Sequence, residues 1–583
     1  MRIKKLRAHD PSIKRILSLY TASLIRYEYV IPAKAGILKN TGFRVKPGMT
    51  DSCKLMSLCI DFRRNLFTTG ILLTSIFCID GLGDTIFSRV YAQNKEIRDR
   101  EIAFAVEMEL LNDEAVPAHL INAEANNGII TLSGSVDNLL ARDRTSKIAE
   151  TVKGVRSVIN TISVTPVTRS DTQIIIDVEK ALAIDPVTDF YEIDTKVDKG
   201  VVVLYGTVGS WAEKQLAEQV VKGVQGVKGV RNKMMIDYGK QRPGSEIKAD
   251  IKGRLSSDVY IDDTLLDVVV KDGKVTLRGT VGSAAEKSRA SYDAWVSGVT
   301  AVDNSGLEVK WWMRDELRRE VKYVDKSDEE IMKAVGDTFF YDPRVASFNI
   351  HIEVKDGVVT LSGIVDNLHA KRVAEQDAKN TIGVRTVKNF LKVRPGKLPT
   401  SPTVMRDPAI VENVHDALSR NPITDRLDIT VESQNEKVYL YGGVNTFYEK
   451  RLAEDVVSRV PGVIDVVNKL EVDYRWPWKS DEEIKNDIES QWYWDVFVNS
   501  DDISVKVHNG VATIYGIVDN QKDSLAVVKD AFEGGAKIVR SFLEFRGDEK
   551  DKQKHTKDKM PRYYYPEYFY DFYSSPYYII PRV

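Results

Sequence analysis

Cysteine is almost absent from this sequence of 583 residues. The three cysteines, Cys53, Cys59 and Cys78, all lie near the N-terminus. From Gln93 onward the chain can therefore form no disulfide, and it offers no thiolate that could act as a nucleophile or a metal ligand. The fold of this part does not depend on the redox state of its compartment.

Histidine is also scarce, and the common catalytic motifs are missing. Six histidines follow Gln93, and no two of them have the i,i+4 spacing that places ligands on one helix face. No HExxH, phosphate-loop or GxSxG motif occurs. We therefore predict a protein that is not an enzyme, holds no metal or cofactor, has no evident small-molecule substrate, and carries its histidines as structural or surface residues.

One apolar run near the N-terminus is shorter than the roughly 20 residues that span a bilayer. It reads LFTTGILLTSIFCI at 66–79, follows the basic pair Arg63-Arg64 and precedes a small-residue site ending at Ala92. This layout is typical of a secretory signal, so we predict export to the periplasm or envelope with cleavage after Ala92. An uncleaved membrane anchor remains the alternative. A signal peptide normally starts a chain, so residues 1–55 are interpreted as a spurious extension before a signal peptide at 56–92.

Acidic residues outnumber basic residues in the rest of the chain. Residues 1–92, the leader, hold 15 Lys and Arg against 6 Asp and Glu, which leaves 68 against 79 beyond them. A net negative body repels nucleic-acid phosphates and anionic lipid headgroups alike. We therefore expect no nucleic-acid partner, and any contact with lipid must be local.

A strand-like stretch is present in six copies. The copies are GIITLSGSV at 128–136, GVVVLYGTV at 200–208, GKVTLRGTV at 273–281, GVVTLSGIV at 357–365, EKVYLYGGV at 436–444 and GVATIYGIV at 510–518. Their apolar residues alternate, as in a strand with one buried face. Repetition at this period predicts a tandem array of small domains.

A glycine occupies an inward-pointing position of each of these strands, where a side chain is expected. Its missing Cβ allows another backbone to approach closely. We expect the approaching element to be the helix that follows the strand. The six glycines, our candidate structural motif, are Gly134, Gly206, Gly279, Gly363, Gly442 and Gly516.

Helix signals flank each strand pair. Ser210, Ser283 and Thr446 each precede a glutamate by three residues, which is the pattern of a capping box. Apolar residues then recur at helical spacing, which predicts that one face packs on the sheet and the charged face lies in water. With an earlier helix and strand and a last strand, the unit is αββαβ. The fold class is α+β, with six small domains, each a mixed sheet with two helices on one face.

The spacing of the motifs sets the domain boundaries. Residues 546–583 are charged and then tyrosine-rich, and are predicted to be a disordered tail. Repeats 1 to 6 are predicted at 98–165, 170–238, 244–310, 326–395, 407–474 and 479–545.

The repeats resemble BON domains, the bacterial osmotically-induced and nodulation family. Repeat 4 has the family's Asp-Pro loop at Asp342-Pro343, its glycine-containing strand at 357–365, and its closing pattern at Gly383 and Asn389. Repeats 5 and 6 depart from this pattern, with Glu436 in place of the first glycine and Ser541 in place of the asparagine. The resemblance implies a periplasmic or envelope-associated protein that binds phospholipid or supports the envelope under osmotic stress, and no catalytic residues.

Four tryptophans follow the last strands of repeats 3 and 5. They are Trp311, Trp312, Trp476 and Trp478. Such side chains suit membrane interfaces, but also packing between domains. We therefore carry two hypotheses: a non-enzymatic array that binds phospholipid membranes or envelope proteins, and a periplasmic chaperone-like or structural scaffold with no lipid affinity.

Overall fold

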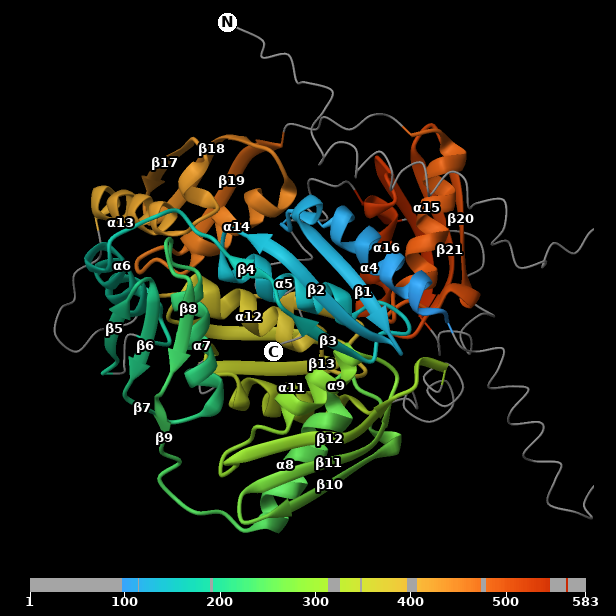
Figure 1. The fold of residues 1–583 in the computed structure, drawn as a ribbon, viewed down its shortest axis with the longest axis horizontal. Coiled ribbons are helices and arrows are strands. Elements are labelled where there is room, and N and C mark those ends of the chain that lie inside the picture. The colour runs from blue at the N-terminus through green and yellow to red at the C-terminus, as the bar shows by residue number, and fades with distance from the viewer. Residues whose placement is uncertain are drawn as a thin grey trace, which may run out of the picture. The chain divides into compact units, whose positions relative to one another are not determined.

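Figure 1 shows the computed structural model, which describes residues 97–113, 115–188, 192–312, 326–345, 349–395, 406–472, 479–545 and 562–564. Residues Asp99–Val583 form one compact unit. The predicted leader, Trp476, Trp478 and all of the predicted tail except 562–564 lie outside the described residues.

Repeat 1 shows the element order of all six repeats. Helix α4 (Asp99–Asn112) leads to the antiparallel strands β1 (Ile121–Asn126) and β2 (Ile129–Val136). Helix α5 (Leu139–Glu150) then connects β2 to β3 (Ser157–Asn160) and β4 (Ser163–Val164), which both run parallel to β2. The predicted αββαβ order and mixed sheet are confirmed.

The other repeats follow the same order. Repeat 2 comprises α6 (Asp171–Ile184), β5 (Asp194–Asp198), β6 (Val201–Tyr205), β7 (Thr207–Val208), α7 (Trp211–Lys222), β8 (Gly229–Asn232) and β9 (Met235–Ile236). Repeat 3 comprises α8 (Gly244–Ser257), β10 (Leu266–Lys271), β11 (Lys274–Val281), α9 (Ala284–Asp293) and β12 (Ala301–Val309). Repeat 4 comprises α11 (Asp328–Tyr341), β13 (Ile350–Lys355), β14 (Val358–Val365), α12 (Leu368–Lys379), β15 (Thr386–Asn389) and β16 (Lys392–Val393). Repeat 5 comprises α13 (Asp407–Arg420), β17 (Ile429–Gln434), β18 (Lys437–Val444), α14 (Phe447–Ser458) and β19 (Asp465–Val472). Repeat 6 comprises α15 (Asp481–Trp494), β20 (Ile503–His508), β21 (Val511–Val518), α16 (Gln521–Glu533) and β22 (Ile538–Phe545).

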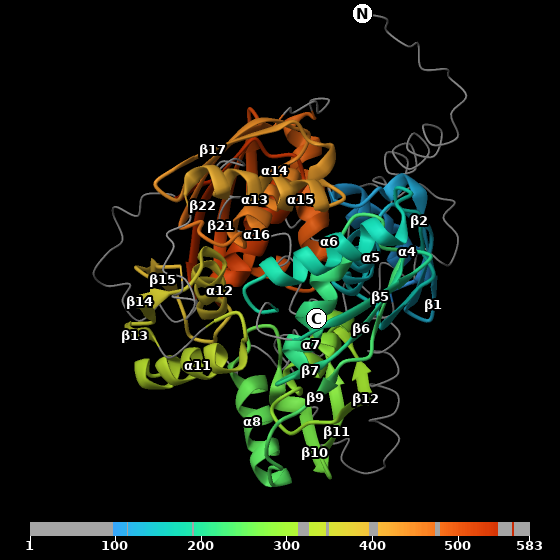
Figure 2. The ribbon, with the colours of Figure 1, turned by 90° about the vertical axis from the view of Figure 1, so that its left-hand side faces the viewer.

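Both helices of a repeat cover one face of its sheet, as predicted. In repeat 4, Val335 of α11 and Val373 of α12 meet Val359 and Leu361 of β14 in one buried cluster. In Figure 2, α8 of repeat 3 lies along the sheet of β10, β11 and β12. None of the helices in the described residues combines the length and the apolar character that a membrane span requires.

An aspartate in the first turn of the first helix holds the turn between the first two strands. In repeat 4, the Asp328 carboxylate accepts the N–H groups of Asp356 at 2.9 Å and Gly357 at 3.0 Å, and these bonds lower the pKa of Asp328. No pattern in the sequence indicated this contact. Asp99, Asp171, Asp407 and Asp481 make the same pair of bonds, whereas repeat 3 has Gly244 at this position.

The strand glycines do meet another backbone closely, but not the backbone we expected. Gly363 has a φ of +123°, and a Cβ there would lie 2.1 Å from the carbonyl oxygen of Asn349, the residue before β13. The expectation that the following helix makes this approach was therefore wrong. The other five glycines face the equivalent carbonyls, those of Leu120, Glu192, Leu265, Asp428 and Asp502.

A short strand forms inside the segment that was predicted to be disordered. β23 (Arg562–Tyr564) pairs antiparallel with β22, with Tyr563 opposite Arg540. The prediction was wrong for these three residues because the edge of β22 offers main-chain groups for pairing.

Candidate functional site

The charged side of several second helices is buried, which corrects the prediction that it lies in water. In α14, Lys450, Arg451 and Asp455 are buried together with the apolar face. Only Ala217 and Val221 are buried in α7, which follows the predicted pattern. The difference arises because other repeats pack against the charged sides, a contact that a single repeat cannot reveal.

Main-chain hydrogen bonds join the repeats in three pairs: 1 with 6, 2 with 5, and 3 with 4. In each pair, an N–H group just after a second helix donates to the last carbonyl of the partner's first helix, which would otherwise lack a partner within its own helix. The bonds run from Lys153 to Trp494 at 2.9 Å, from Gln225 to Arg420 at 2.8 Å, and from Ile382 to Ser257 at 2.9 Å. Equivalent positions are therefore used three times.

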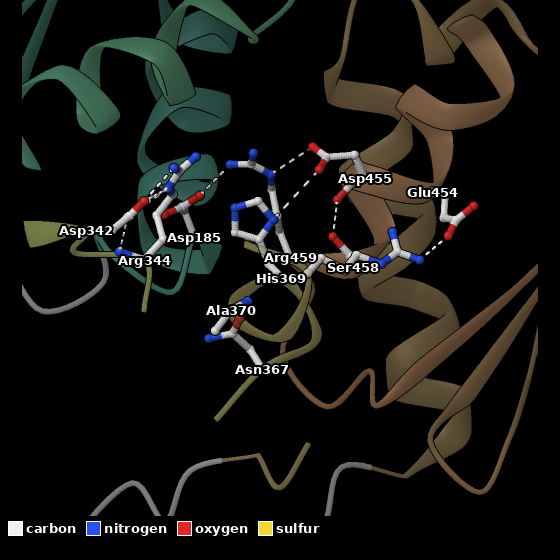
Figure 3. A network of polar contacts seen from close by, with 11 residues as sticks. Asp185, Asp342, Arg344, Asn367, His369, Ala370, Glu454, Asp455, Ser458 and Arg459 are labelled. Carbon is white, nitrogen blue, oxygen red and sulfur yellow. Dashed lines mark hydrogen bonds and ion pairs between the residues drawn. The ribbon is translucent and has the colours of Figure 1, made fainter. Parts of the chain in front are cut away.

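A buried polar network joins repeats 2, 4 and 5 (Figure 3). Arg459 follows α14, and its guanidinium contacts Asp185 of repeat 2 at 3.0 Å and Asp455 at 3.1 Å. Asp455 in turn lies 3.7 Å from Nδ1 of His369 on α12. Arg372 of the same helix pairs with Glu454.

His369 lies in this network without a hydrogen bond. It is 3% exposed, and neither ring nitrogen has a hydrogen-bond partner among the described residues. Burial and the nearby guanidinium groups of Arg459 and Arg344 hold its pKa well below the usual range of histidine. The junction therefore contains a neutral imidazole among arginines.

A second charged junction joins repeats 1 and 6. Lys529 of α16 binds Glu533 at 2.7 Å and lies 3.5 Å from the buried Asp530. Burial and the charge of Glu533 raise the pKa of Glu109 on α4 to about 8. Burial and the neighbouring carboxylates also raise the pKa values of Asp530 and Glu533.

Aromatic side chains join further repeats. Trp211 of repeat 2 stacks on Trp295 of repeat 3, with ring centroids 5.0 Å apart. The Lys522 ammonium of repeat 6 lies 4.0 Å from the ring centroid of Tyr260 in repeat 3 and 3.9 Å from that of Phe497. The sequence analysis did not select these residues, because an isolated aromatic gives no signal of its partner.

Of the four selected tryptophans, Trp311 and Trp312 lie in described residues and are half-buried. The centroids of their rings lie 6.2 Å apart, and the Lys153 ammonium of repeat 1 lies 5.7 Å from the centroid of the Trp311 ring. These contacts agree with packing between repeats. Trp476 and Trp478 lie outside the described residues, so their interpretation remains a prediction.

Exposed lysines lie beside tyrosines on the outer sheet faces, away from the helices. Lys469 is within 5.9 Å of the Tyr439 ring and 5.3 Å of the Tyr441 ring. The same combination occurs on two further sheets. Its members are Lys196 and Lys233 around Tyr205 in repeat 2, and Lys506 beside Tyr515, which stacks on Phe542, in repeat 6.

An asparagine in the last strand ties that strand to the second helix. Asn160 donates to the carbonyl of Arg142 at 2.8 Å and accepts the N–H of Ile162 at 3.0 Å. Asn232, Asn389 and Asn468 repeat both bonds. Repeat 6 has Ser541 instead and makes no such bond to its helix among the described residues.

Reactive side chains do not converge in the described part of the chain. No group of three or more His, Cys, Asp or Glu residues there is arranged to hold a metal ion. The polar groups that do converge lie at buried junctions between repeats.

Comparisons with known proteins agree with this architecture. A BON-domain family profile matches residues 98–166, 170–237, 244–310, 327–395, 406–474 and 480–546. Osmotically-inducible protein Y of Escherichia coli (strain K12) is 35% identical over 120 residues, which cover 19% of this chain and 60% of that relative. The solved C-terminal domain of CdsD, the structural protein of the Type III secretion system of Chlamydia trachomatis, is 17% identical over 39% of this chain and 100% of that domain, with a TM-score of 0.11. With six matched segments over most of its length, the chain belongs to the BON-domain family.

Proposed function

We propose that this protein is a non-enzymatic, exported array of BON domains that binds phospholipid membranes of the cell envelope and supports the envelope under osmotic stress. Family membership and the osmotically inducible relative support a role in the envelope. The observation that carries the lipid proposal is the set of exposed lysines beside tyrosines on the outer sheet faces of repeats 2, 5 and 6.

The chemistry of these groups suits a membrane interface. A tyrosine places an apolar ring with a polar tip at headgroup level, and a lysine beside it places its ammonium among lipid phosphates. Each such lysine contributes about 1 kcal/mol on an anionic membrane. Local groups of this kind are required because the body as a whole is net negative.

Lipid binding is tested by co-sedimentation of the full chain with vesicles of phosphatidylglycerol and phosphatidylethanolamine at low salt. A variant with Lys196, Lys233, Lys469 and Lys506 changed to Gln is expected to bind more than tenfold more weakly. The control changes four half-buried lysines that already pair with carboxylates, so it removes the same net charge. These are Lys248, Lys310, Lys437 and Lys485.

Equal losses in the two variants would show a general charge effect and contradict the role of the lysine–tyrosine groups. No binding of the unchanged chain at any lipid composition would overturn the lipid proposal. If the chain then protected an unfolding client protein from aggregation, the chaperone-like scaffold would replace it.

A further inference from the structure

The sheet of repeat 6 contains an additional strand, β23, beyond the strand that follows its second helix. β23 pairs with β22 through Val539 opposite Tyr564 and Ser541 opposite Arg562. In the other five repeats, the strands that follow the second helix lie at the end of their sheets within the described residues. Repeat 6 therefore shows what this sheet edge can accept.

The edge of β22 is uninterrupted, like the edges of β12 and β19, whereas the last strands of repeats 1, 2 and 4 are divided in two. In repeat 4 the last strand breaks after Asn389, where the side chain accepts the N–H of Leu391, and resumes as β16. Repeat 6 has Ser541 at this position, and β22 continues through it from Ile538 to Phe545. An uninterrupted edge presents a regular row of main-chain donors and acceptors. The added strand begins opposite Ser541.

The added strand is not fixed by a tight turn. Sixteen residues, 546–561, separate it from β22, whereas hairpin loops usually have about two to five. This connection is rich in both signs of charge and contains no turn sequence that would set the register. A hairpin turn of ordinary length therefore does not set the three-residue pairing between β23 and β22.

We propose that the edge of β22 is a strand-acceptor site for an extended Arg-Tyr-Tyr peptide, and that the chain's own tail occupies it. Main-chain pairing at a sheet edge is an established way to recognise peptides. The occupant in this structure is the segment Arg562–Tyr564, which is extended and pairs antiparallel with β22. The proposal does not rest on the proposed lipid contact, although both involve β22, whose Phe542 stacks on Tyr515.

The occupancy is tested in the full chain by cysteine cross-linking. Cys53, Cys59 and Cys78 are changed to Ser, and Arg540→Cys is combined with Tyr563→Cys, since these residues lie directly opposite each other. Mild oxidation is expected to give an internal disulfide in most molecules. The control combines Arg540→Cys with Tyr564→Cys, which lies one register position away from the pairing with Arg540, and should cross-link at least fivefold less. Absence of the first disulfide, or equal yields in the two variants, would overturn the pairing.

The acceptor role is tested with a peptide of residues 560–567 that carries Cys in place of Tyr563. It is offered to two full chains that both contain Arg540→Cys, one with the tail unchanged and one with Tyr563→Pro, which lacks the N–H needed for the ladder. Capture is expected to be at least fivefold greater in the proline variant. Equal capture would show that the tail does not close the edge, and no capture above that of a scrambled peptide would show that the edge accepts no such strand.

Discussion

At the scale of single residues, alternation in the sequence identified the strand glycines but not what they touch. The period of two predicts an inward position for Gly442, because Val438 and Leu440 are in phase with it and buried, although Gly442 itself is exposed. The alternation does not show that the carbonyl oxygen of Asp428, fourteen positions earlier, lies where a Cβ of residue 442 would be. The approach depends on how the chain enters the first strand, which no pattern in the strand encodes.

The chain offers a matched pair of glycines for testing this contact. Gly442→Ala is expected to destabilise repeat 5 by at least about 2 kcal/mol, because its φ of +136° disfavours a side chain and a Cβ would lie 2.3 Å from the Asp428 oxygen. Gly443→Ala adds a Cβ with no heavy atom within 4 Å, so its effect should be close to zero or slightly stabilising. Urea denaturation of both variants gives the comparison, and equal midpoints would contradict the close approach.

At the scale of helices and strands, local signals predicted the element starts well. The predicted capping box at Ser210 forms both of its bonds. Ser283 and Thr446 also cap their helices by accepting the N–H groups of Glu286 and Glu449, whose carboxylates accept the N–H groups of Gly282 and Asn445. These motifs succeed because their partners lie within four residues. The buried charge on α14 was not predictable in this way, because its partners lie on other repeats.

The histidine between α12 and α14 predicts a dependence on pH. Because the folded state holds the pKa of His369 below that of the unfolded chain, the unfolded chain binds the proton first as the pH falls. The stability contributed by neutral His369 is therefore complete above pH about 6.5 and declines below it, by up to tenfold in the folding equilibrium per pH unit. His369→Gln should weaken the loss of stability between pH 6.5 and 5, measured by urea denaturation.

An exposed histidine in the same repeat provides the control. His351 lies on β13 with its side chain 69% exposed, so His351→Gln should keep the pH profile of the unchanged chain. If His369→Gln and His351→Gln both kept the pH dependence of stability of the unchanged chain, His369 would not be the source of that dependence.

At the scale of the whole molecule, the repeat number was readable from the sequence but the pairing of repeats was not. Six similar units carry six similar surfaces, and the sequence does not say which of them meet. The pairs 1 with 6 and 2 with 5 join segments that are hundreds of residues apart, as Lys153 and Trp494 do. Tandem repeats commonly contact only their neighbours in sequence, so the expectation from repeats alone would favour a linear array.

Dividing the chain between repeats 3 and 4 separates these two arrangements. A cut after residue 318 lies between the described ranges and leaves repeats 1 to 3 on one fragment and 4 to 6 on the other. Every one of the three pairs is then split, so fragments 93–318 and 319–583, when produced together, should form a 1:1 complex that persists through size-exclusion chromatography at micromolar concentration. Each fragment alone should expose the charged helix faces and associate with itself or aggregate, because Arg459 would lose its ion pair with Asp185. A cut after residue 400 instead retains the pair of repeats 3 and 4 on one fragment, so that fragment should contain a more protected segment in hydrogen exchange than either product of the first cut. If the two fragments were instead monomeric, well folded and unable to bind each other, the pairing of repeats would be contradicted. A linear array would give that result, because any cut removes only one contact between neighbouring repeats.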